Sequence, residues 1–237
     1  CVANFSAFSM PLVVKGRLVR AAGNHSGAVR PEYRGRGLYR PLKKRAFDWA
    51  EREGFEAGIL LTDKPDLYEP YGFQAVPQFR FQGAVPRTGF RLPMARDLDL
   101  KQQADLHITQ MALEARQPVS EIFSVVRQKE MFLLNAHFDP DIRLSLLEED
   151  NAVVAWKPQG ETSLQILDVA ARQIPPLAHI LASLGAHFEW ADVFFPTDRL
   201  CWDGVATRHQ SDCVLMVQGL ELGSQVQPFM LSPMADF

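Results

Sequence analysis

The chain has 237 residues, of which 47% are hydrophobic and 22% are charged. This is the composition of a folded globular protein with one large or two medium-sized domains, and it excludes a disordered chain. A formal net charge of −3 and a pI of about 6.1 give no support to a nucleic-acid-binding surface. No apolar run approaches the roughly 20 residues that a membrane span requires. We therefore expect neither a nucleic-acid partner nor a membrane partner.

The cysteines are few and far apart along the chain, at Cys1, Cys201 and Cys213. They do not suggest a disulfide framework, and no spacing of cysteines and histidines is that of a zinc site. The sequence therefore predicts a reducing, cytoplasmic location and no bound metal.

Residues 2–14 alternate loosely between apolar and small polar side chains, which predicts a half-buried strand. A second strand is predicted from Arg17 to Ala22, and Gly23-Asn24 can break or bulge it. The segment from His25 to Arg30 then carries the chain onward. We expect these strands to form an antiparallel meander.

A short loop that contains glycines and arginines follows these strands, with the sequence Arg34-Gly35-Arg36-Gly37-Leu38-Tyr39-Arg40. At the first turn of a helix, backbone N–H groups lack intrahelical partners and the helix dipole is positive, so a phosphate can bind there. Glycine lets a ligand approach the main chain, and arginine offers forked donors that suit phosphate oxygens. The loop therefore predicts an anion site, although a strand-to-helix turn with surface arginines would have the same sequence.

The residues from Leu38 to Glu53 have helical apolar spacing, with Pro41 in the first turn and Gly54 at the end. A short buried strand is predicted next, at residues 57–62. Strand, loop, helix and strand then form one βαβ unit, with the anion loop at the carboxyl end of its first strand. Ligands of open α/β sheets bind at that edge.

The loop is not of the nucleoside-triphosphate type, since no Gly-Lys-Ser/Thr follows it. It resembles motif A of the GCN5-related N-acetyltransferases (GNAT), Arg/Gln-x-x-Gly-x-Gly/Ala, except that Tyr39 stands where Gly or Ala is usual. A second element, Leu67-Tyr68-x-x-Tyr71-Gly72-Phe73, resembles the second marker of that family. Both elements are similar to the multi-domain acetyltransferases of the enhanced intracellular survival (Eis) type. The likeness covers roughly residues 2–85.

This resemblance implies an N-acetyltransferase that moves an acetyl group from acetyl-CoA, its co-substrate, to a primary amine by direct transfer. In the family, the tyrosine at the position of Tyr68 returns a proton to the leaving thiolate, and a strand amide near Val29 would stabilise the oxyanion. The residues that would bind the coenzyme are Ala28, Val29, Arg30, Arg34, Gly35, Arg36, Gly37, Leu38, Tyr39 and Arg40.

The general base is a separate question. His25 lies near the place where many family members have a glutamate, and a histidine suits the task at neutral pH, so it is our candidate. A single histidine on a strand can equally be a hydrogen-bonded structural residue. In the Eis type the terminal carboxylate also reaches the active site, and Phe237 ends an apolar tail that we expect to dock. The family's first two helices, which wall the acceptor groove, do not precede residues 2–14 here, so an aminoglycoside, a polyamine and a peptide amine all remain candidate acceptors.

The second half of the chain repeats the same order of elements. We expect a strand at Leu164–Ala170, a loop from Arg172 to Pro176, a helix from Leu177 to Leu184 and a strand at Ala191–Phe195, and then a helix from Asp198 to Val205 and a strand at Val214–Leu220. This order predicts a diverged internal repeat. Its loop has no glycine, and its prolines remove amide donors that a phosphate would need.

The sequence thus predicts an α/β protein in which a GNAT fold, with a mixed and largely antiparallel sheet and flanking helices, precedes a degenerate GNAT-like domain. The expected boundaries are 1–85 for the acetyl-CoA-binding domain, 86–96 for a linker and 97–237 for the second domain. Two readings from other classes stay open: a non-catalytic acyl-CoA-binding or assembly module, and a purely structural subunit. Exposed strand edges would also favour a homo-oligomer.

Overall fold

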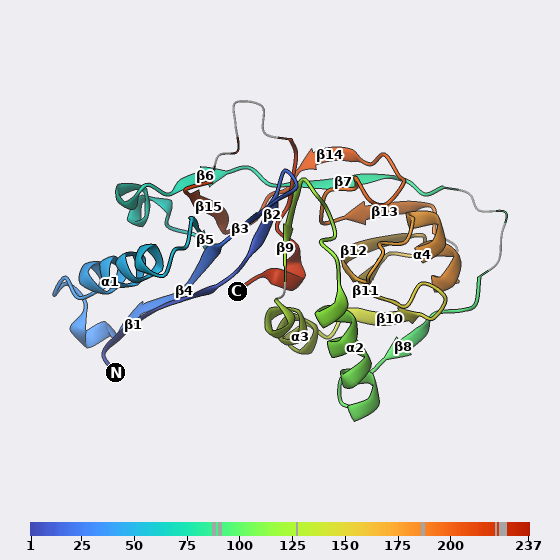
Figure 1. Ribbon diagram of the computed structural model, residues 1–237, viewed down its shortest axis with the longest axis horizontal. Helices are drawn as coiled ribbons and strands as arrows, with labels where there is room; N and C mark the ends of the chain where they lie inside the picture. Colours follow the sequence, from blue (N-terminus) through green and yellow to red (C-terminus); the bar gives the residue numbers. More distant parts are fainter. Residues whose placement is uncertain (87–88, 90–91, 127, 186–187, 221, 223–226) are drawn as a thin grey trace.

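The computed structural model describes residues 1–237 except 87–88, 90–91, 127, 186–187, 221 and 223–226. The α/β class predicted from the sequence is confirmed, and the two largest sheets lie side by side (Figure 1). The strands and α-helices of the N-terminal part are β1 (Ala3–Ser9), β2 (Leu12–Val14), β3 (Arg17–Val19), β4 (Ala21–Val29), α1 (Tyr39–Arg52), β5 (Ala57–Thr62), β6 (Gln74–Val76) and β7 (Phe79–Ala84).

The remaining strands and α-helices follow in the C-terminal part. They are β8 (Arg96–Leu98), α2 (Gln103–Ala115), β9 (Phe123–Val125), α3 (Lys129–Phe138), β10 (Arg143–Leu147), β11 (Ala152–Gln159), β12 (Ser163–Ala170), α4 (Leu177–Leu184), β13 (Trp190–Val193), β14 (Val205–Arg208) and β15 (Val214–Gln218). Short 3-10 helices lie at η1 (Pro31–Tyr33), η2 (Pro65–Leu67), η3 (Glu69–Tyr71) and η4 (Pro233–Ala235).

The first sheet has the strand order β1-β4-β5-β15-β6, and the second sheet has the order β14-β7-β13-β12-β11-β10-β8. A small third sheet, β3-β2-β9, links the two parts. The pairs β4–β5 and β12–β13 are parallel, and the other pairs of described strands are antiparallel. The prediction of mixed, largely antiparallel sheets is thus confirmed.

Two strands lie in the other sheet from the one that we expected. β7 lies within residues 1–85, which we assigned to the first domain, yet it pairs with β13 and β14 in the second sheet. The strand predicted at residues 214–220 is β15, which pairs with β5 and β6 in the first sheet. Pairing partners far apart in sequence are not encoded in local patterns, so this exchange was not visible. The domain boundaries expected at residues 85 and 97 stay a prediction. They do not coincide with the division between the two sheets, because β7 and β15 each pair across it.

Three local predictions were also wrong. The helix expected from Asp198 to Val205 is a turn at residues 198–201 followed by β14, because residues 205–208 pair with β7. The strand expected at residues 2–14 is divided into β1 and β2, which join different sheets. The strand expected from Arg17 to Ala22 is interrupted at Arg20, between β3 and β4, and not at Gly23-Asn24, which lies inside β4. The shift in the register of β4 with β1 lies further on, between the pairs of His25 and Ala28.

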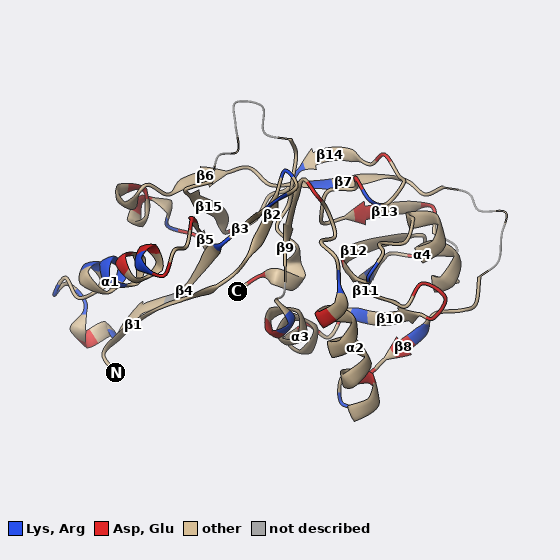
Figure 2. Ribbon diagram, in the orientation of Figure 1, with Lys and Arg blue, Asp and Glu red and all other residues tan. Residues whose placement is uncertain are grey.

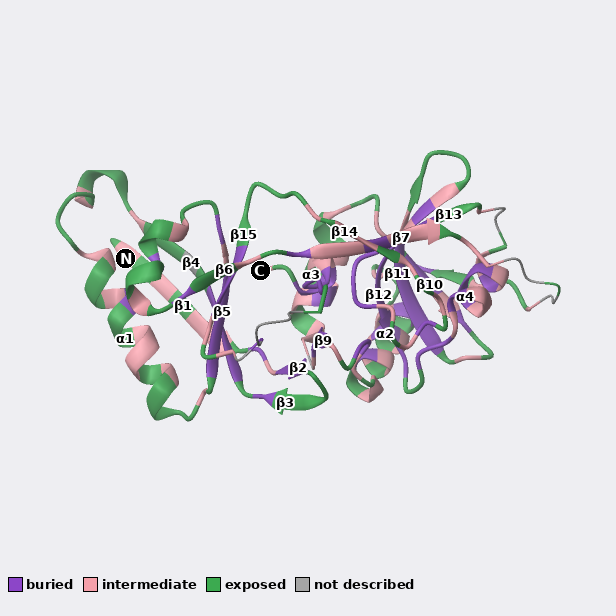
Figure 3. Ribbon diagram, turned by 90° about the horizontal axis from the view of Figure 1, so that it is seen from above, coloured by how far each residue is buried: buried purple, intermediate pink, exposed green. Residues whose placement is uncertain are grey.

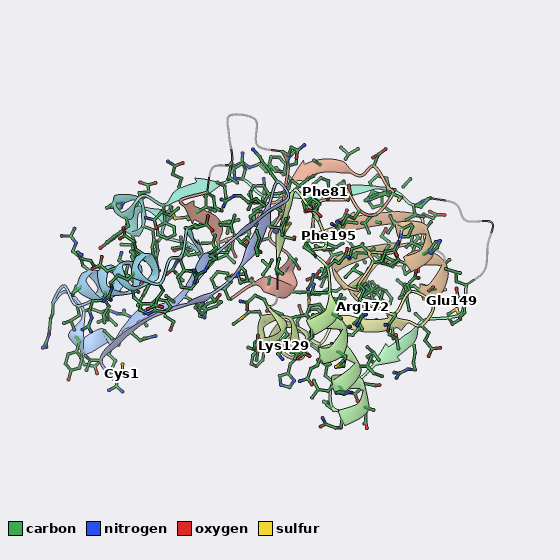
Figure 4. All side chains as sticks on the ribbon, viewed as in Figure 1. Cys1, Phe81, Lys129, Glu149, Arg172 and Phe195 are labelled. Atoms are coloured by element: carbon green, nitrogen blue, oxygen red, sulfur yellow. The ribbon has the colours of Figure 1, made fainter. Side chains whose placement is uncertain are left out.

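Each sheet has its own apolar core. The second sheet packs against α4 around residues such as Leu164, Ile166 and Leu177, and this core includes Phe81 and Phe195 (Figure 4). A core on one face of the first sheet includes Ile59, Leu215 and Phe229, so the C-terminal tail contributes to it. Figure 3 shows β5 as a buried strand and the loop before α1 as exposed. The sheets are therefore the rigid part, and the exposed loop is presented at the end of the molecule.

Candidate active site

The strands β4 and β5 pair over only three residues. Their parallel register joins residues 21–23 of β4 to residues 57–59 of β5, although β4 continues to Val29 and β5 to Thr62. Asn24 occupies the end of the pairing: its side-chain nitrogen donates to the carbonyl oxygen of Ile59 at 3.3 Å. Beyond this point, the edge of β4 that faces β5 is open.

The backbone at this open edge presents a donor. The Arg30 amide donates to the carbonyl oxygen of Val2, just before β1, at 2.9 Å. Successive amides of a strand point to opposite edges, so the Val29 amide points toward β5. This is the amide that the resemblance assigns to the oxyanion.

The loop from Arg30 to Leu38, which we call the glycine–arginine loop, follows β4 and leads into α1. Gly35 and Gly37 have φ angles of +73° and +71°, which other residues rarely adopt. A Cβ atom at either position would meet no described heavy atom within 4 Å. Leu38 caps α1 without a side-chain hydrogen bond. The loop therefore offers open main chain at the positive end of a helix.

The arginines of the loop lie at the surface. Figure 2 shows Lys and Arg positions in the loop and along α1, where Asp and Glu positions also occur. Arg34 donates to the carbonyl oxygen of Val29 at 3.1 Å, and Arg36 donates to that of Glu32 at 3.2 Å while lying over the Tyr33 ring. Each guanidinium keeps further N–H donors, so both can reach an anion at the loop.

A cleft of about 390 Å³ lies between this loop and the turn that carries Tyr68. It is lined by the loop, by the N-terminal turns of α1 and by η2 and η3. Its lining includes Val29, Gly35, Tyr39, Lys43, Asp66 and Tyr71. The two sequence elements singled out for chemistry therefore face each other across one cavity.

Tyr68 lies between η2 and η3 and is nearly buried, with 9% of its surface exposed. Its ring packs with Leu60, Phe73 and Met216. Its hydroxyl is hydrogen-bonded to the Tyr39 hydroxyl at 2.9 Å. The Gly72 φ angle of +85° ends the turn and returns the chain to β6. Tyr68 is thus held by a small core, and its polar end meets the first turn of α1.

Lys43, on α1, is a residue of this cleft that the sequence analysis did not single out. It is 3% exposed, and its ammonium donates to the carbonyl oxygen of Leu67. The ammonium lies 4.8, 4.9 and 4.6 Å from the ring centroids of Tyr39, Tyr68 and Tyr71. Its spacing of four residues from Tyr39 on one helix face was the signal that could have found it.

The environment shifts two of these groups. Burial, followed by the hydrogen bond to Tyr68, raises the pKa of the Tyr39 hydroxyl far above its usual range. Burial, followed by the charge of Arg40, lowers the pKa of Lys43. Tyr39 therefore stays protonated across the physiological range, and it can act as a hydrogen-bond donor.

His25 is exposed and lies on the other face of the first sheet from Tyr68. Its ring centroid is 6.0 Å from that of Phe237, which packs on the core around Ile59. Tyr68 packs with Leu60, the next residue of β5, whose side chain points the opposite way. The structure therefore places the predicted acid and the predicted base on opposite faces at the open edge of β4, and it docks the C-terminal tail on the His25 face.

The corresponding loop of the second half is filled. Ile174 and Pro175 are buried, and the Leu177 amide at the start of α4 donates to the carbonyl oxygen of Leu200 at 2.8 Å. Arg172 remains exposed (Figure 4). The prediction that this loop offers no phosphate site agrees with these contacts.

No group of three His, Cys, Asp or Glu side chains in the described part of the chain is arranged to hold a metal ion. Among the described helices, none combines the length and apolar character that crossing a bilayer would take.

Comparison with known proteins shows a family match in the N-terminal part and similar solved structures over most of the chain. Residues 1–76 match the family described as Acetyltransferase (GNAT) domain. No curated protein sequence matches the chain. Similar solved structures include a GCN5-related N-acetyltransferase from Kribbella flavida, with 19% identity, a TM-score of 0.55 and coverage of 91% of this chain and 56% of that one.

Two further structures have the same fold. Eis1 from Mycobacterium abscessus is 13% identical, with a TM-score of 0.58 and coverage of 90% of this chain and 60% of that one. A probable N-acyltransferase from Enterococcus faecalis V583 is 17% identical, with a TM-score of 0.56 and coverage of 91% and 58%. The chain thus spans less than two thirds of the length of these structures, and the likeness extends through both of its parts.

Proposed function

We propose, on the premise that residues 1–76 carry a GNAT domain and that the whole chain has an Eis-like fold, that this protein transfers an acetyl group from acetyl-CoA to a primary amine. One observation carries the proposal: the cleft beside the glycine–arginine loop is lined by Tyr39, and the Tyr39 hydroxyl is hydrogen-bonded to that of Tyr68 at 2.9 Å. The proposed anion loop and the proposed proton donor are thereby connected through one side chain.

The diphosphate of the coenzyme would bind to the glycine–arginine loop. The first turn of α1 orients the backbone amides that follow Gly35 toward the diphosphate, and the arginines supply the positive charge opposite it. The residues proposed for the coenzyme are those expected from the sequence: Ala28, Val29, Arg30, Arg34, Gly35, Arg36, Gly37, Leu38, Tyr39 and Arg40. The pantetheine arm would then run along the open edge of β4.

The transfer itself requires three groups. An uncharged amine attacks the thioester carbon, and the Val29 amide donates to the oxygen that becomes negative. When the carbon–sulfur bond breaks, the thiolate takes the proton of the Tyr68 hydroxyl and leaves as the thiol. Holding both substrates in one geometry supplies a large part of the rate.

The amine proton must leave on the acceptor side. We propose His25 as its acceptor, because His25 is exposed on the face of the first sheet opposite Tyr68. A base on that face and an acid on the other let the amine approach the thioester from the side away from the sulfur. An aminoglycoside, a polyamine and a peptide amine are the candidate acceptors.

Two wider features belong to the same proposal. The three cysteines are exposed and unpaired, which agrees with a reducing, cytoplasmic location. The edge of β1 away from β4 carries no described strand, which would allow copies of the chain to associate.

A second candidate function is a non-catalytic acyl-CoA-binding module. The observation that favours it is Tyr39, whose hydroxyl lies above Gly27 in the space beside Tyr68: a Cβ at Gly27 would lie 1.8 Å from that oxygen. Under this reading, the coenzyme would bind to the loop and its thioester would remain unreacted.

The test combines binding with turnover. A thermal shift with acetyl-CoA measures binding, and release of free thiol over a panel of amines measures transfer. The enzyme reading predicts a raised melting midpoint and thiol release that depends on both the amine and Tyr68. A raised midpoint with no thiol release supports the binding module. An unchanged midpoint at millimolar acetyl-CoA contradicts both and leaves a structural subunit.

A further inference from the structure

We infer that Tyr39 is a positioning residue for Tyr68: its hydroxyl fixes the Tyr68 hydroxyl and donates to the Tyr68 oxygen after that residue has given its proton to the CoA thiolate. This inference rests on the proposed function, because it assigns Tyr39 a part in the same transfer. It deepens that proposal by naming what holds the acid in place.

The contact between the two hydroxyls is direct. Their oxygens lie 2.9 Å apart, although the residues are 29 positions apart in sequence and come from α1 and the η2–η3 turn. Gly27 on β4 makes room for this contact, since any Cβ at that position would lie 1.8 Å from the Tyr39 oxygen. Tyr39 is thus held from below by the strand and from the side by Tyr68.

In the resting state either hydroxyl can be the donor of this hydrogen bond. Once Tyr68 has given up its proton, only Tyr39 can donate, and burial raises the pKa of Tyr39 so that its own proton stays. A hydrogen bond to a charged oxygen is stronger than one to a neutral oxygen. The contact therefore gains strength at the moment when Tyr68 becomes a phenolate.

The charge of Lys43 would also stabilise a phenolate at Tyr68. The Lys43 ammonium lies over both rings at 4.8 and 4.9 Å, and within the described residues no carboxylate is at ion-pair distance from it. Other groups face the cleft from each side: Arg40 from α1, Asp66 from η2 and Tyr71 from η3. A phenolate at Tyr68 would thus have a buried cation beside it.

The proton balance is simple. The thiolate takes the Tyr68 proton, the Tyr68 oxygen becomes negative, and the Tyr39 O–H donates to it without transferring its own proton. Solvent then restores the proton of Tyr68 after the thiol has left. No other reactant is needed.

The first test reads the tyrosines directly. The chain has four tyrosines, at positions 33, 39, 68 and 71, and all of them line this cleft or touch the cage around Lys43. Ultraviolet titration of tyrosinate therefore reports on this site alone. We expect Tyr39→Phe to move one of the remaining tyrosinate steps upward by about one pH unit, because the phenolate loses its donor.

Tyr71→Phe is the matched control. It removes a hydroxyl from a ring of the same cage, and the hydrogen bonds of the described residues include none from that hydroxyl. We expect it to remove one tyrosinate from the titration and to leave the other steps in place. Equal titration curves for Tyr39→Phe and Tyr71→Phe would overturn the inference.

The second test uses turnover. We expect Tyr39→Phe to lower kcat about 10- to 100-fold and to move the alkaline limb of the kcat profile upward. Because Tyr39 acts through Tyr68, the Tyr39→Phe/Tyr68→Phe double variant should be no slower than Tyr68→Phe. Wild-type kcat in Tyr39→Phe, or additive losses in the double variant, would overturn the inference while the proposed function stands. Wild-type protein that neither binds acetyl-CoA nor releases thiol would overturn both.

Discussion

Two units of this molecule have the same order of elements and opposite character. The unit β4–α1–β5 and the unit β12–α4–β13 each join two parallel strands through a loop and a helix. In the first unit, pairing stops after three residues and the loop is exposed. In the second, all four residues of β13 pair with β12, and the loop is packed into the core. One topology thus serves as an open site in one half and as a filled scaffold in the other.

The difference lies in what occupies the carboxyl end of the first strand. In the second unit an ion pair between Arg116 and Asp168 is buried there, with nitrogen and oxygen 2.7 Å apart and both side chains about 5% exposed. In the first unit the Val29 amide and a cleft lie at the end of β4. The two units therefore differ in whether a buried ion pair or an open cleft lies near the end of the first strand.

The largest effect is expected from breaking that ion pair. Arg116→Met leaves the Asp168 carboxylate buried without its partner, which should lower the free energy of unfolding by about 3–5 kcal/mol. Chemical denaturation measures this. Lys129→Met, at the exposed pair with Glu114, is the control and should leave the unfolding midpoint nearly unchanged. Similar midpoints for the two variants would show that the filled unit does not depend on its ion pair.

The next effect concerns the open loop. Gly37→Ala places a side chain at a φ angle of +71°, where the diphosphate should approach, so we expect the acetyl-CoA Kd to rise about tenfold and stability to fall by about 1–2 kcal/mol. Calorimetry and denaturation measure the two effects. Gly160→Ala, at a φ angle of +68° in the turn before β12, has the same strain and the same open surroundings. It should lose stability without losing affinity; equal loss of affinity in both would contradict the proposed loop.

The third effect is expected at Lys43, a buried cation of the cleft, in comparison with the exposed Lys44. The pKa of Lys43 is lowered by burial and then by Arg40, so the folded state binds fewer protons than the unfolded state between that lowered value and 10.5. Wild-type stability should therefore rise with pH in this window. Lys43→Met should remove that rise, and the exposed Lys44→Met should keep it. The free energy of unfolding, measured from pH 7 to 10.5, tests this prediction. Parallel curves of that free energy against pH for wild type and Lys43→Met would refute it.

The smallest effect is expected in the tail that joins the two parts. Burial raises the pKa of Asp236, and its carbonyl oxygen accepts a hydrogen bond from Asn135 on α3. The charged form is thus disfavoured in the fold, so stability from this group is gained as pH falls through the raised pKa. Asp236→Asn should raise the melting midpoint slightly at pH 7, and the gain should shrink as the pH approaches 4. A gain that grows at low pH would exclude this explanation.

Local sequence patterns predicted much of the architecture. Helix α1 was expected at residues 38–53 and lies at 39–52, and β5 was expected and found at residues 57–62, because apolar spacing and terminal glycines report on single elements. The loop between β4 and α1 was identified from Gly35 and Gly37. By contrast, the helix expected from Asp198 to Val205 is absent, and β14, which begins at Val205, was not predicted, since its strand state depends on pairing with β7, more than 100 residues earlier.

The sequence by itself predicted the chemistry: a loop of glycines and arginines at the start of a helix, proposed to bind an anion, a tyrosine about thirty residues later, and a second loop whose prolines remove amide donors. The tertiary structure alone decided which groups meet. It brought the Tyr39 hydroxyl to Tyr68 over Gly27, buried Lys43 among three rings, and exchanged β7 and β15 between the sheets. Spacing along the chain fixes local conformation, whereas these contacts arise from packing between segments that no local pattern relates.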